Sequence, residues 1–287
     1  MNKEHIIISG CSISSDVTSI DTDDHKFHSY PFWLERNQFK VTNLSQSGFD
    51  NKTISRLVIH EVSKLLKNGK NPDEMFVMVQ WSGVDRMSSF VTKDETIDYD
   101  ALWKFNFIED THDKGWTVSR GKSGAEFWND YRNLLYTEEG FFIKTLENIL
   151  TTQWFLKSVG VKYKMFTGWD IFTFNTGKTG GYGTNHESGG QFLTDKIYCN
   201  KFNELLKDTF NNSTHLWDLI DFSNFWTFDN HLIKFGGIIQ WVEHNFEKTN
   251  NHFRGGHPFD FHPNDSAHKE FCNKVLIPLM CRIIKSI

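Results

Sequence analysis

The chain has 287 residues, a formal net charge of −5 and an aromatic content of 15%. This length suits one large domain or two small ones, and the 27 Phe and 10 Trp residues are enough to build a substantial core. No basic stripe alternates with aromatic residues, which argues against a nucleic-acid partner. No apolar run reaches the length needed to span a membrane, so we expect no membrane partner.

The four cysteines are scattered along the chain and form no CxxC pair. This spacing argues against a disulfide scaffold or a zinc knuckle and favours free thiols in a reducing compartment. The charged N-terminal residues lead directly into three isoleucines, so we expect no signal peptide. Together these features predict a cytoplasmic or virion-associated protein.

Two apolar runs in the first third of the chain, His5–Ser9 and Met75–Trp81, predict buried strands of a parallel sheet, and the run at residues 40–44 predicts a further short strand. Each run ends in a polar cluster. Open α/β sheets place their sites at the carboxyl ends of the strands, so this alternation predicts a doubly wound α/β fold.

The segments between these strands carry helix signals. Residues 13–28 are polar and acidic and predict a loop, after which Ser29 can cap a short helix with Pro31 in its first turn. Asp50 or Asn51 can cap a longer helix that Gly69 ends. Its apolar positions recur at helical spacing: Ile54, Leu57, Val58, Val62, Leu65 and Leu66.

Residues 87–122 lack clear periodicity, and we interpret them as an insertion over the edge of the site. A capping box at 123–126 opens a long helical region, which Gly140 can break and Gly160 closes. Residues 161–166 predict a fourth strand.

A Gly-rich loop follows at 168–192, and a second insertion is expected over 168–214. A fifth strand is expected near Leu216–Ile220 and a short helix over 237–245. Asn264 or Asp265 can cap the last helix, which Pro278 should kink. The whole chain, 1–287, is therefore predicted to form one α/β/α domain around a flavodoxin-like, doubly wound parallel sheet of about five strands.

The segment Asp260-Phe261-His262-Pro263 carries the clearest chemical signal. Proline disfavours helical backbone for the preceding residue, so His262 is expected to be extended. Residues i and i+2 of an extended segment point to the same side, so Asp260 and His262 can face one pocket. A carboxylate beside a histidine supplies two members of a Ser-His-Asp triad.

The best candidate for the third member is Ser12, just beyond the first predicted strand. A serine in this place is more often a turn residue or helix cap, so the signal depends on its combination with Asp260 and His262. Cys11, directly beside it, is interpreted as a small buried apolar residue, with a nucleophilic thiol as the less favoured alternative.

These residues resemble the blocks of the GDSL esterases, also called the SGNH-hydrolase superfamily. Ser12 in Gly10-Cys11-Ser12 matches the nucleophile, although Cys11 replaces the usual Asp. The segment Asn43-Leu-Ser-Gln-Ser-Gly48-Phe-Asp-Asn51 resembles the second block, with Gly48 as a backbone donor to the oxyanion. The resemblance implies a triad of Ser12, Asp260 and His262, an oxyanion hole from Ser12 and Gly48, and no metal or cofactor.

The third block departs from the family pattern, which is Gly-x-Asn-Asp. Here Gly83-Val84-Asp85-Arg86 places Asp85 where the family Asn donates to the oxyanion, and an ionised Asp can only accept. Losing one such donor typically costs about 10²–10³ in turnover. Ser82, Arg86 or a residue from the insertions can replace it; otherwise the site is impaired. The alternative is that Arg86 pairs structurally with Asp85.

The resemblance implies hydrolysis of a small carboxylic ester, and an O-acetyl group on a saccharide is the favoured substrate class. Loop aromatics suggest contact with a saccharide: Trp103, Trp116, Trp169, Tyr182 and Phe192. One alternative is a catalytically impaired carbohydrate-binding or structural module on the same fold. A second is a metal-assisted hydrolase using the segment His252–His268, although the usual zinc spacings are missing.

Overall fold

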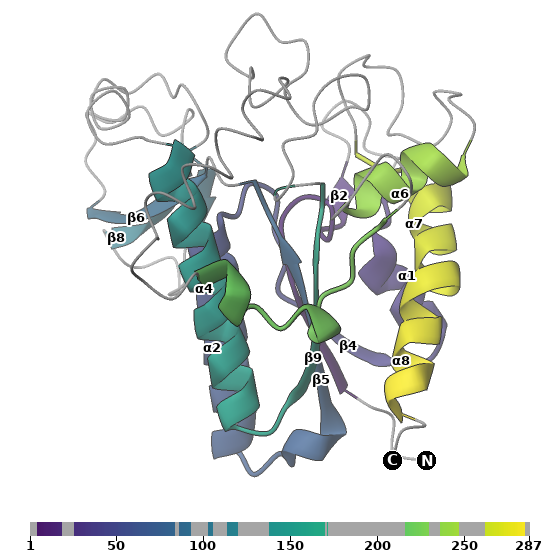
Figure 1. Cartoon of the computed structure of the whole chain (residues 1–287), viewed down its shortest axis with the longest axis horizontal. Helices are drawn as coiled ribbons and strands as arrows, with labels where there is room; N and C mark the ends of the chain where they lie inside the picture. Colours follow the sequence, from purple (N-terminus) through teal and green to yellow (C-terminus); the bar gives the residue numbers. More distant parts are fainter. Residues whose placement is uncertain are drawn as a thin grey trace, which may run out of the picture.

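The structure is a computed structural model, and a four-stranded parallel sheet forms its centre (Figure 1). The strands are β1 (His5–Ser9), β4 (Lys40–Asn43), β5 (Met75–Trp81) and β9 (Lys162–Thr167), in the order β4-β1-β5-β9. All four were predicted from the sequence to within one residue at each end. The structure describes residues 5–18, 26–83, 86–92, 103–105, 114–119, 138–169, 171, 216–229, 236–246 and 262–284.

Strand β1 lies between β4 and β5 and pairs with both in parallel register. Ile6, Ile7 and Ile8 are fully buried because helices cover both sides of the sheet. In Figure 1, α2 (Asn51–Lys67) and α4 (Glu138–Ser158) lie on one side. The helices α1 (Tyr30–Arg36), α7 (Asp265–Phe271) and α8 (Ile277–Ile284) lie on the other. The continuous apolar strands thus follow from their double coverage.

Helix α2 begins where the sequence predicts. The Asp50 side chain caps it by accepting a hydrogen bond from the Thr53 N–H at 2.9 Å. Ile54, Val58 and Val62 recur at i, i+4 and i+8 and are fully buried. Burial of each such side chain contributes about 1.5–3 kcal/mol, so this stripe fixes α2 against the sheet.

Helix α4 corrects one expectation. Gly140 lies within its first turn and does not break it. The helix ends near Gly160, whose φ of +71° is a left-handed conformation that favours glycine. The predicted capping box at 123–126 lies outside the described residues.

The fifth strand predicted at Leu216–Ile220 was wrong. Leu216–Leu219 instead forms the 3-10 helix η3. The chain reaches the free edge of β9 further along, where Phe225 forms a single parallel bridge with Met165. The Trp226 N–H donates to the Met165 carbonyl at 2.7 Å. The apolar run at 216–220 therefore packs against α4 and does not extend the sheet.

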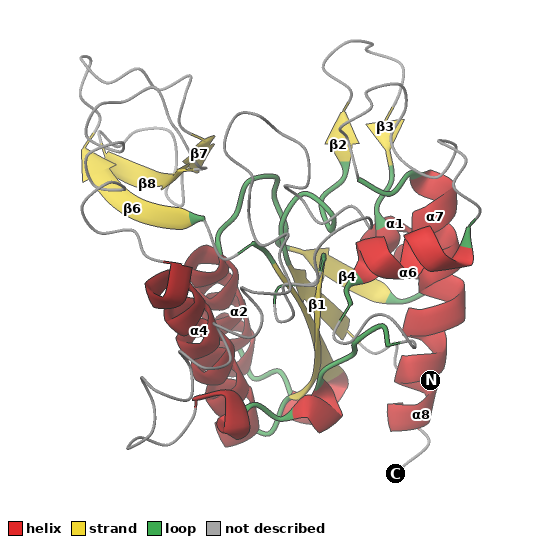
Figure 2. Cartoon of the chain, turned by 45° about the horizontal axis from the view of Figure 1, so that its top comes forward, coloured by secondary structure: helices red, strands yellow, loops and turns green. Residues whose placement is uncertain are grey.

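Two stretches without sequence periodicity contain short strands. In the predicted loop 13–28, β2 (Val17–Thr18) pairs with β3 (Lys26–Phe27). Within 87–122, a separate antiparallel sheet has the order β6-β8-β7. Its strands are β6 (Met87–Thr92), β7 (Trp103–Phe105) and β8 (Lys114–Ser119), and Figure 2 shows it beyond the main sheet.

The C-terminal helical region is interrupted before its proline. A π-helical segment, Cys272–Leu276, separates α7 from α8, and the Ile277 N–H donates to the Cys272 carbonyl. Pro278 has no N–H to donate to the carbonyl four residues earlier. The wider π turn lies directly before Pro278 and accommodates this loss. The kink expected at Pro278 stays a prediction.

Short helix α6 (Ile238–Asn245) matches the helix predicted over 237–245. The helix cap at α7 is Asn264, whose side chain accepts from the Ala267 N–H at 3.0 Å. None of the helices in the described ranges is long and apolar enough to cross a membrane.

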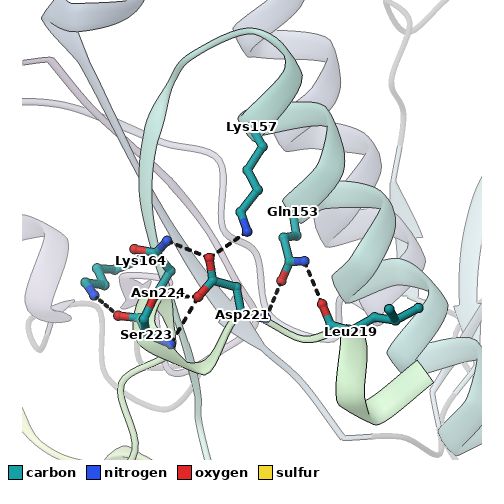
Figure 3. A network of polar contacts seen from close by, with 7 residues as sticks. All are labelled: Gln153, Lys157, Lys164, Leu219, Asp221, Ser223 and Asn224. Atoms are coloured by element: carbon teal, nitrogen blue, oxygen red, sulfur yellow. Dashed lines mark hydrogen bonds and ion pairs between the residues drawn. The ribbon is translucent and has the colours of Figure 1, made fainter. Parts of the chain in front are cut away.

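A polar network fixes the segment after η3 against α4 (Figure 3). Gln153 on α4 donates to the Leu219 carbonyl at 2.9 Å and accepts from the Asp221 N–H at 2.7 Å. Lys164 on β9 donates to the carbonyl of Ser223 at 2.5 Å. These hydrogen bonds satisfy backbone groups that have no partner within a helix or strand.

Asp221 lies at the centre of this network. Its carboxylate meets the Lys157 ammonium at 2.6 Å, the Asn224 amide at 3.1 Å and the Ser223 hydroxyl. Burial acts to raise the pKa of Asp221, but Lys157, Ser223 and Asn224 outweigh it and lower the pKa to about 2. The carboxylate therefore stabilises the fold only while it is ionised.

Replacing Asp221 with Asn should lower the free energy of unfolding by about 1 kcal/mol near neutral pH. The effect is small because solvent screens the ion pair between Asp221 and the half-exposed Lys157. Because the folded pKa is depressed from 3.8 to about 2, the stabilisation is present above 3.8 and is lost as the pH falls through 2. Urea unfolding of both proteins across this range checks the prediction, with Asp218→Asn as an exposed control. A difference that stays constant down to pH 2 contradicts it.

Candidate functional site

Ser12 lies in a tight turn at the carboxyl end of β1. The Ser14 N–H donates to the Cys11 carbonyl at 3.0 Å and closes this turn. Ser12 is 2% exposed, so only a small part of the residue reaches the surface. The placement matches the prediction from the sequence.

His262 meets Ser12 across 250 positions of sequence. The Nε2 atom of its imidazole lies 2.7 Å from the Ser12 Oγ atom. His262 is partly buried and directly precedes Pro263 and the capped start of α7. Its position is therefore set by the packing of α7.

Helix α7 is anchored to the segment that enters α1. The Asp265 carboxylate in its first turn accepts from the His28 N–H at 2.9 Å. Phe271, at the end of α7, packs edge-on against Tyr30 of α1 with ring centroids 6.1 Å apart. These two contacts bring the C-terminal part of the chain to the turn that carries Ser12.

Gly48 lies in the loop after β4 with a φ of +94°, a left-handed conformation that favours glycine. The Gln46 N–H of the same loop donates to the Gly10 carbonyl at 3.3 Å. The loop with Gly48 is thus bonded directly to the turn that carries Ser12. Asp260 and Asp85 lie outside the described residues, so their roles stay predictions.

Cys11 is a buried neighbour of Ser12. Its side chain is 0% exposed and its Sγ lies 3.3 Å from the Gln80 Oε1 atom. Burial acts to raise the pKa of the thiol, but the Arg86 guanidinium and nearby hydrogen bonds outweigh it and lower the pKa. The position of Cys11 in the core matches its interpretation as a small buried residue.

Arg86 enters the site as a buried cation. Its Nη1 donates to the Phe49 carbonyl at 3.1 Å, next to Gly48. Its guanidinium carbon lies 5.5 Å from the centre of the Trp169 ring. Arg86 therefore connects the loop after β4, the end of β5 and the end of β9.

Ser82, at the end of β5, is held by a residue that sequence reasoning had not assigned to the site. Asn51 of α2 accepts from the Ser82 N–H at 2.7 Å and donates to the Ser82 carbonyl at 3.1 Å. The same amide donates to the Thr145 hydroxyl at 3.1 Å. Asn51 was expected as a possible helix cap and as the last residue of the segment that resembles the second block, and neither gives a signal of this role.

Ser29 also has a role other than the predicted one. It occupies the N-cap position of α1 but makes no side-chain cap. Its hydroxyl oxygen lies 3.1 Å from the Ser14 carbonyl oxygen and 2.8 Å from the Asp16 carboxylate, and its single proton can be donated to either acceptor. Ser29 thus stabilises the turn after β1, where its short polar side chain meets the Ser14 carbonyl.

Of the loop aromatics proposed to contact a saccharide, Trp169 is buried under Arg86. The side chains of Trp103 and Trp116 are not described, and Tyr182 and Phe192 lie outside the described residues. The same is true of His252 and His257 in the alternative metal segment. Within the described part of the chain, no group of three or more His, Cys, Asp or Glu is placed to hold a metal.

No family model and no curated protein matches this chain. Function is therefore inferred from the arrangement of the site itself. Its central feature is the approach of His262 to Ser12 beside the loop that carries Gly48.

Replacing Gly10 with Ala should disturb this arrangement. An added Cβ atom would lie 2.5 Å from the Ser14 hydroxyl and 2.8 Å from the Gln80 amide oxygen. Such overpacking typically costs about 1–3 kcal/mol, which we expect to see as a lower free energy of unfolding in urea. Gly69→Ala is the control, because its Cβ would meet no atom within 4 Å. Its only cost is the left-handed backbone at a φ of +81°, which destabilises alanine by about 1–2 kcal/mol.

The two glycine variants also differ in a second readout. Gly10→Ala should change the environment of the turn after β1, while Gly69→Ala should leave it unchanged. Backbone amide chemical shifts of residues 11–14 measure this difference. Equal shifts in the two variants would contradict the close packing of the turn.

Proposed function

We propose that this protein is a serine hydrolase that cleaves carboxylic esters through Ser12, His262 and Asp260. The observation that carries the proposal is the 2.7 Å approach of the His262 Nε2 atom to the Ser12 hydroxyl. A nucleophile and a base within hydrogen-bond reach are the working pair of covalent acyl transfer.

In the first step, the neutral His262 accepts the Ser12 proton while the Ser12 oxygen attacks the ester carbonyl. The tetrahedral intermediate collapses, the alcohol leaves with the proton from His262, and an acyl group remains on Ser12. A water molecule then attacks the acyl group, with His262 again as base, and releases the acid. Asp260 orients the imidazole and stabilises its protonated form.

The developing oxyanion is held by the backbone N–H groups of Ser12 and Gly48 in this proposal. Arg86 compensates for the missing family Asn. Its guanidinium is fixed beside Gly48 through the Phe49 carbonyl at 3.1 Å. The same charge lowers the pKa of the Cys11 thiol against the effect of burial, so it favours negative charge in the turn that carries Ser12.

Ser12 is favoured over its neighbours as nucleophile. Cys11 is 0% exposed. The Ser14 hydroxyl is 2.7 Å from the Tyr30 hydroxyl and 3.0 Å from the Gln80 amide oxygen, so it is committed to the core. Ser12 alone among these three has its side-chain oxygen on an imidazole nitrogen.

In more detail, we propose that residues 1–287 form a three-layer, flavodoxin-like domain of the SGNH-hydrolase superfamily. The helices on both sides of the parallel sheet support this fold (Figure 1). The proposed insertions are 87–122, which includes the β6-β8-β7 sheet, and 168–214. The substrate is proposed to be a short acyl group, such as an O-acetyl group on a saccharide.

Turnover of a p-nitrophenyl ester series tests the function. Ser12→Ala should lower kcat by at least about 10³-fold, because the attacking oxygen is lost. Cys11→Ala is the control for the neighbouring thiol and should retain activity within about tenfold, because the thiol does not attack.

Four outcomes contradict the proposal. Equal rates for wild type and Ser12→Ala would show that Ser12 is not the nucleophile. Loss of activity only in Cys11→Ala assigns the attack to the thiol. Turnover that survives Ser12→Ala but is abolished by a chelator favours metal-assisted hydrolysis, and saccharide binding without any turnover favours a binding module.

Arg86→Gln should lower kcat by about 10–10²-fold with little change in KM, because a charge that acts on the transition state is removed. Arg86→Lys should recover part of the loss, since the charge is kept and the planar contact with Trp169 is weakened. Arg56→Gln on α2, a partly buried arginine outside the loop that carries Gly48, is the control. A loss confined to KM contradicts the assigned role.

A further inference from the structure

Gln80 is a buried polar residue on β5, directly beneath the turn that carries Ser12. Its side chain is 0% exposed. A polar side chain in the interior of a central strand is costly unless its groups are satisfied, whereas an apolar side chain of similar size would pack there without that requirement. The contacts of this amide therefore indicate why the position is polar.

The amide oxygen of Gln80 accepts hydrogen bonds from the turn. The Cys11 N–H and the Ser14 hydroxyl each donate to Oε1 at 3.0 Å, and the Cys11 thiol lies 3.3 Å away. On the other side, the Nε2 atom donates to the Trp81 carbonyl at 2.5 Å. These bonds fix the orientation of the amide, with its oxygen towards the turn.

Two glycines allow the backbone to approach this amide. A Cβ atom at Gly10 would lie 2.8 Å from Oε1, and one at Gly168 would lie 2.8 Å from Nε2. Contacts this short displace the amide or the chain. The turn after β1 and the end of β9 are thus both shaped around Gln80.

The position of the Cys11 backbone decides where the Ser12 N–H points. The Cys11 N–H is bonded to Gln80, and the Cys11 carbonyl is bonded to the Ser14 N–H at 3.0 Å. In a trans peptide the carbonyl and the following N–H point in opposite directions, and the described residues contain no cis peptide. The Ser12 N–H is therefore directed away from the Ser14 N–H.

We infer that Gln80 is a positioning residue that holds the turn so that the hydroxyl of Ser12 meets His262 and its N–H faces the oxyanion. This inference rests on the proposed hydrolase function. Gln80 acts through the turn and does not touch the substrate. Its neutral amide also supplies acceptors for the turn without placing a negative charge beneath the developing oxyanion.

The first test compares Gln80→Leu with wild type in ester turnover. We expect kcat to fall about 10²-fold with KM within about threefold, because misplacement of reacting groups costs turnover more than ground-state binding. Gln153→Leu is the matched control. Gln153 is equally buried and bonds to two backbone groups, but these belong to the segment after η3. It should lower stability and leave kcat unchanged.

The second test is the pH dependence of Gln80→Glu. A neutral glutamic acid can still donate to the Trp81 carbonyl and accept from the Cys11 N–H. An ionised one repels both that carbonyl and the oxyanion. The ratio of kcat for Gln80→Glu to kcat for wild type should therefore fall at least about tenfold as pH rises through the titration of the new carboxyl group. The ratio cancels the titration of groups that the two proteins share.

The outcomes separate this inference from the proposed function. If wild type turns over and Gln80→Leu keeps its kcat, or if the Gln80→Glu ratio is independent of pH while both proteins stay folded, Gln80 has no positioning role and the hydrolase proposal stands. If Gln80→Leu does not fold, the pH dependence of the kcat ratio of Gln80→Glu to wild type alone decides whether Gln80 positions the turn. If wild type shows no turnover, the hydrolase proposal fails and this inference fails with it.

Discussion

The turn after β1 is held by hydrogen bonds from three separate parts of the chain, and the site depends on this arrangement. Gln80 on β5 binds its interior. Asn43, at the end of β4, donates to the Ser14 carbonyl at 2.9 Å, and the hydroxyl of Ser29, at the start of α1, lies 3.1 Å from the same oxygen. A turn fixed from several sides keeps a side chain in one orientation, which is what a nucleophile needs.

The second part of the site reaches this turn through the packing of α7 against α1. Tyr30 lies between the turn after β1 and helix α7. Its hydroxyl is 2.7 Å from the Ser14 hydroxyl, and its ring contacts Phe271 and His268 of α7. Burial raises the pKa of Tyr30, so it stays a neutral hydrogen-bonding group. One aromatic side chain thus joins the core beneath Ser12 to the helix that directly follows the His262-Pro263-Asn264 segment.

The sequence predicted the parts of this fold that have a local cause. Consecutive apolar residues predicted the buried strands β1 and β5, and β4 and β9 were predicted as further short strands. The meeting of Ser12 and His262 was expected from the Asp260-x-His262 motif and from the resemblance to the SGNH-hydrolase blocks. The strand predicted at Leu216–Ile220 was wrong because the apolar residues of this segment pack on α4 and not in the sheet. The roles of Gln80, Asn51 and Ser29 were missed because each depends on backbone groups far away in the sequence, which no local pattern encodes.

The most direct test of the account is to map the adduct that a fluorophosphonate forms with the native protein. Peptide mass spectrometry should place the phosphonyl group on Ser12, and His262→Asn should react at least about 10²-fold more slowly because the base is lost. An adduct on another residue, no adduct at all, or equal rates for wild type and His262→Asn would contradict the claim that Ser12 and His262 act as one catalytic pair.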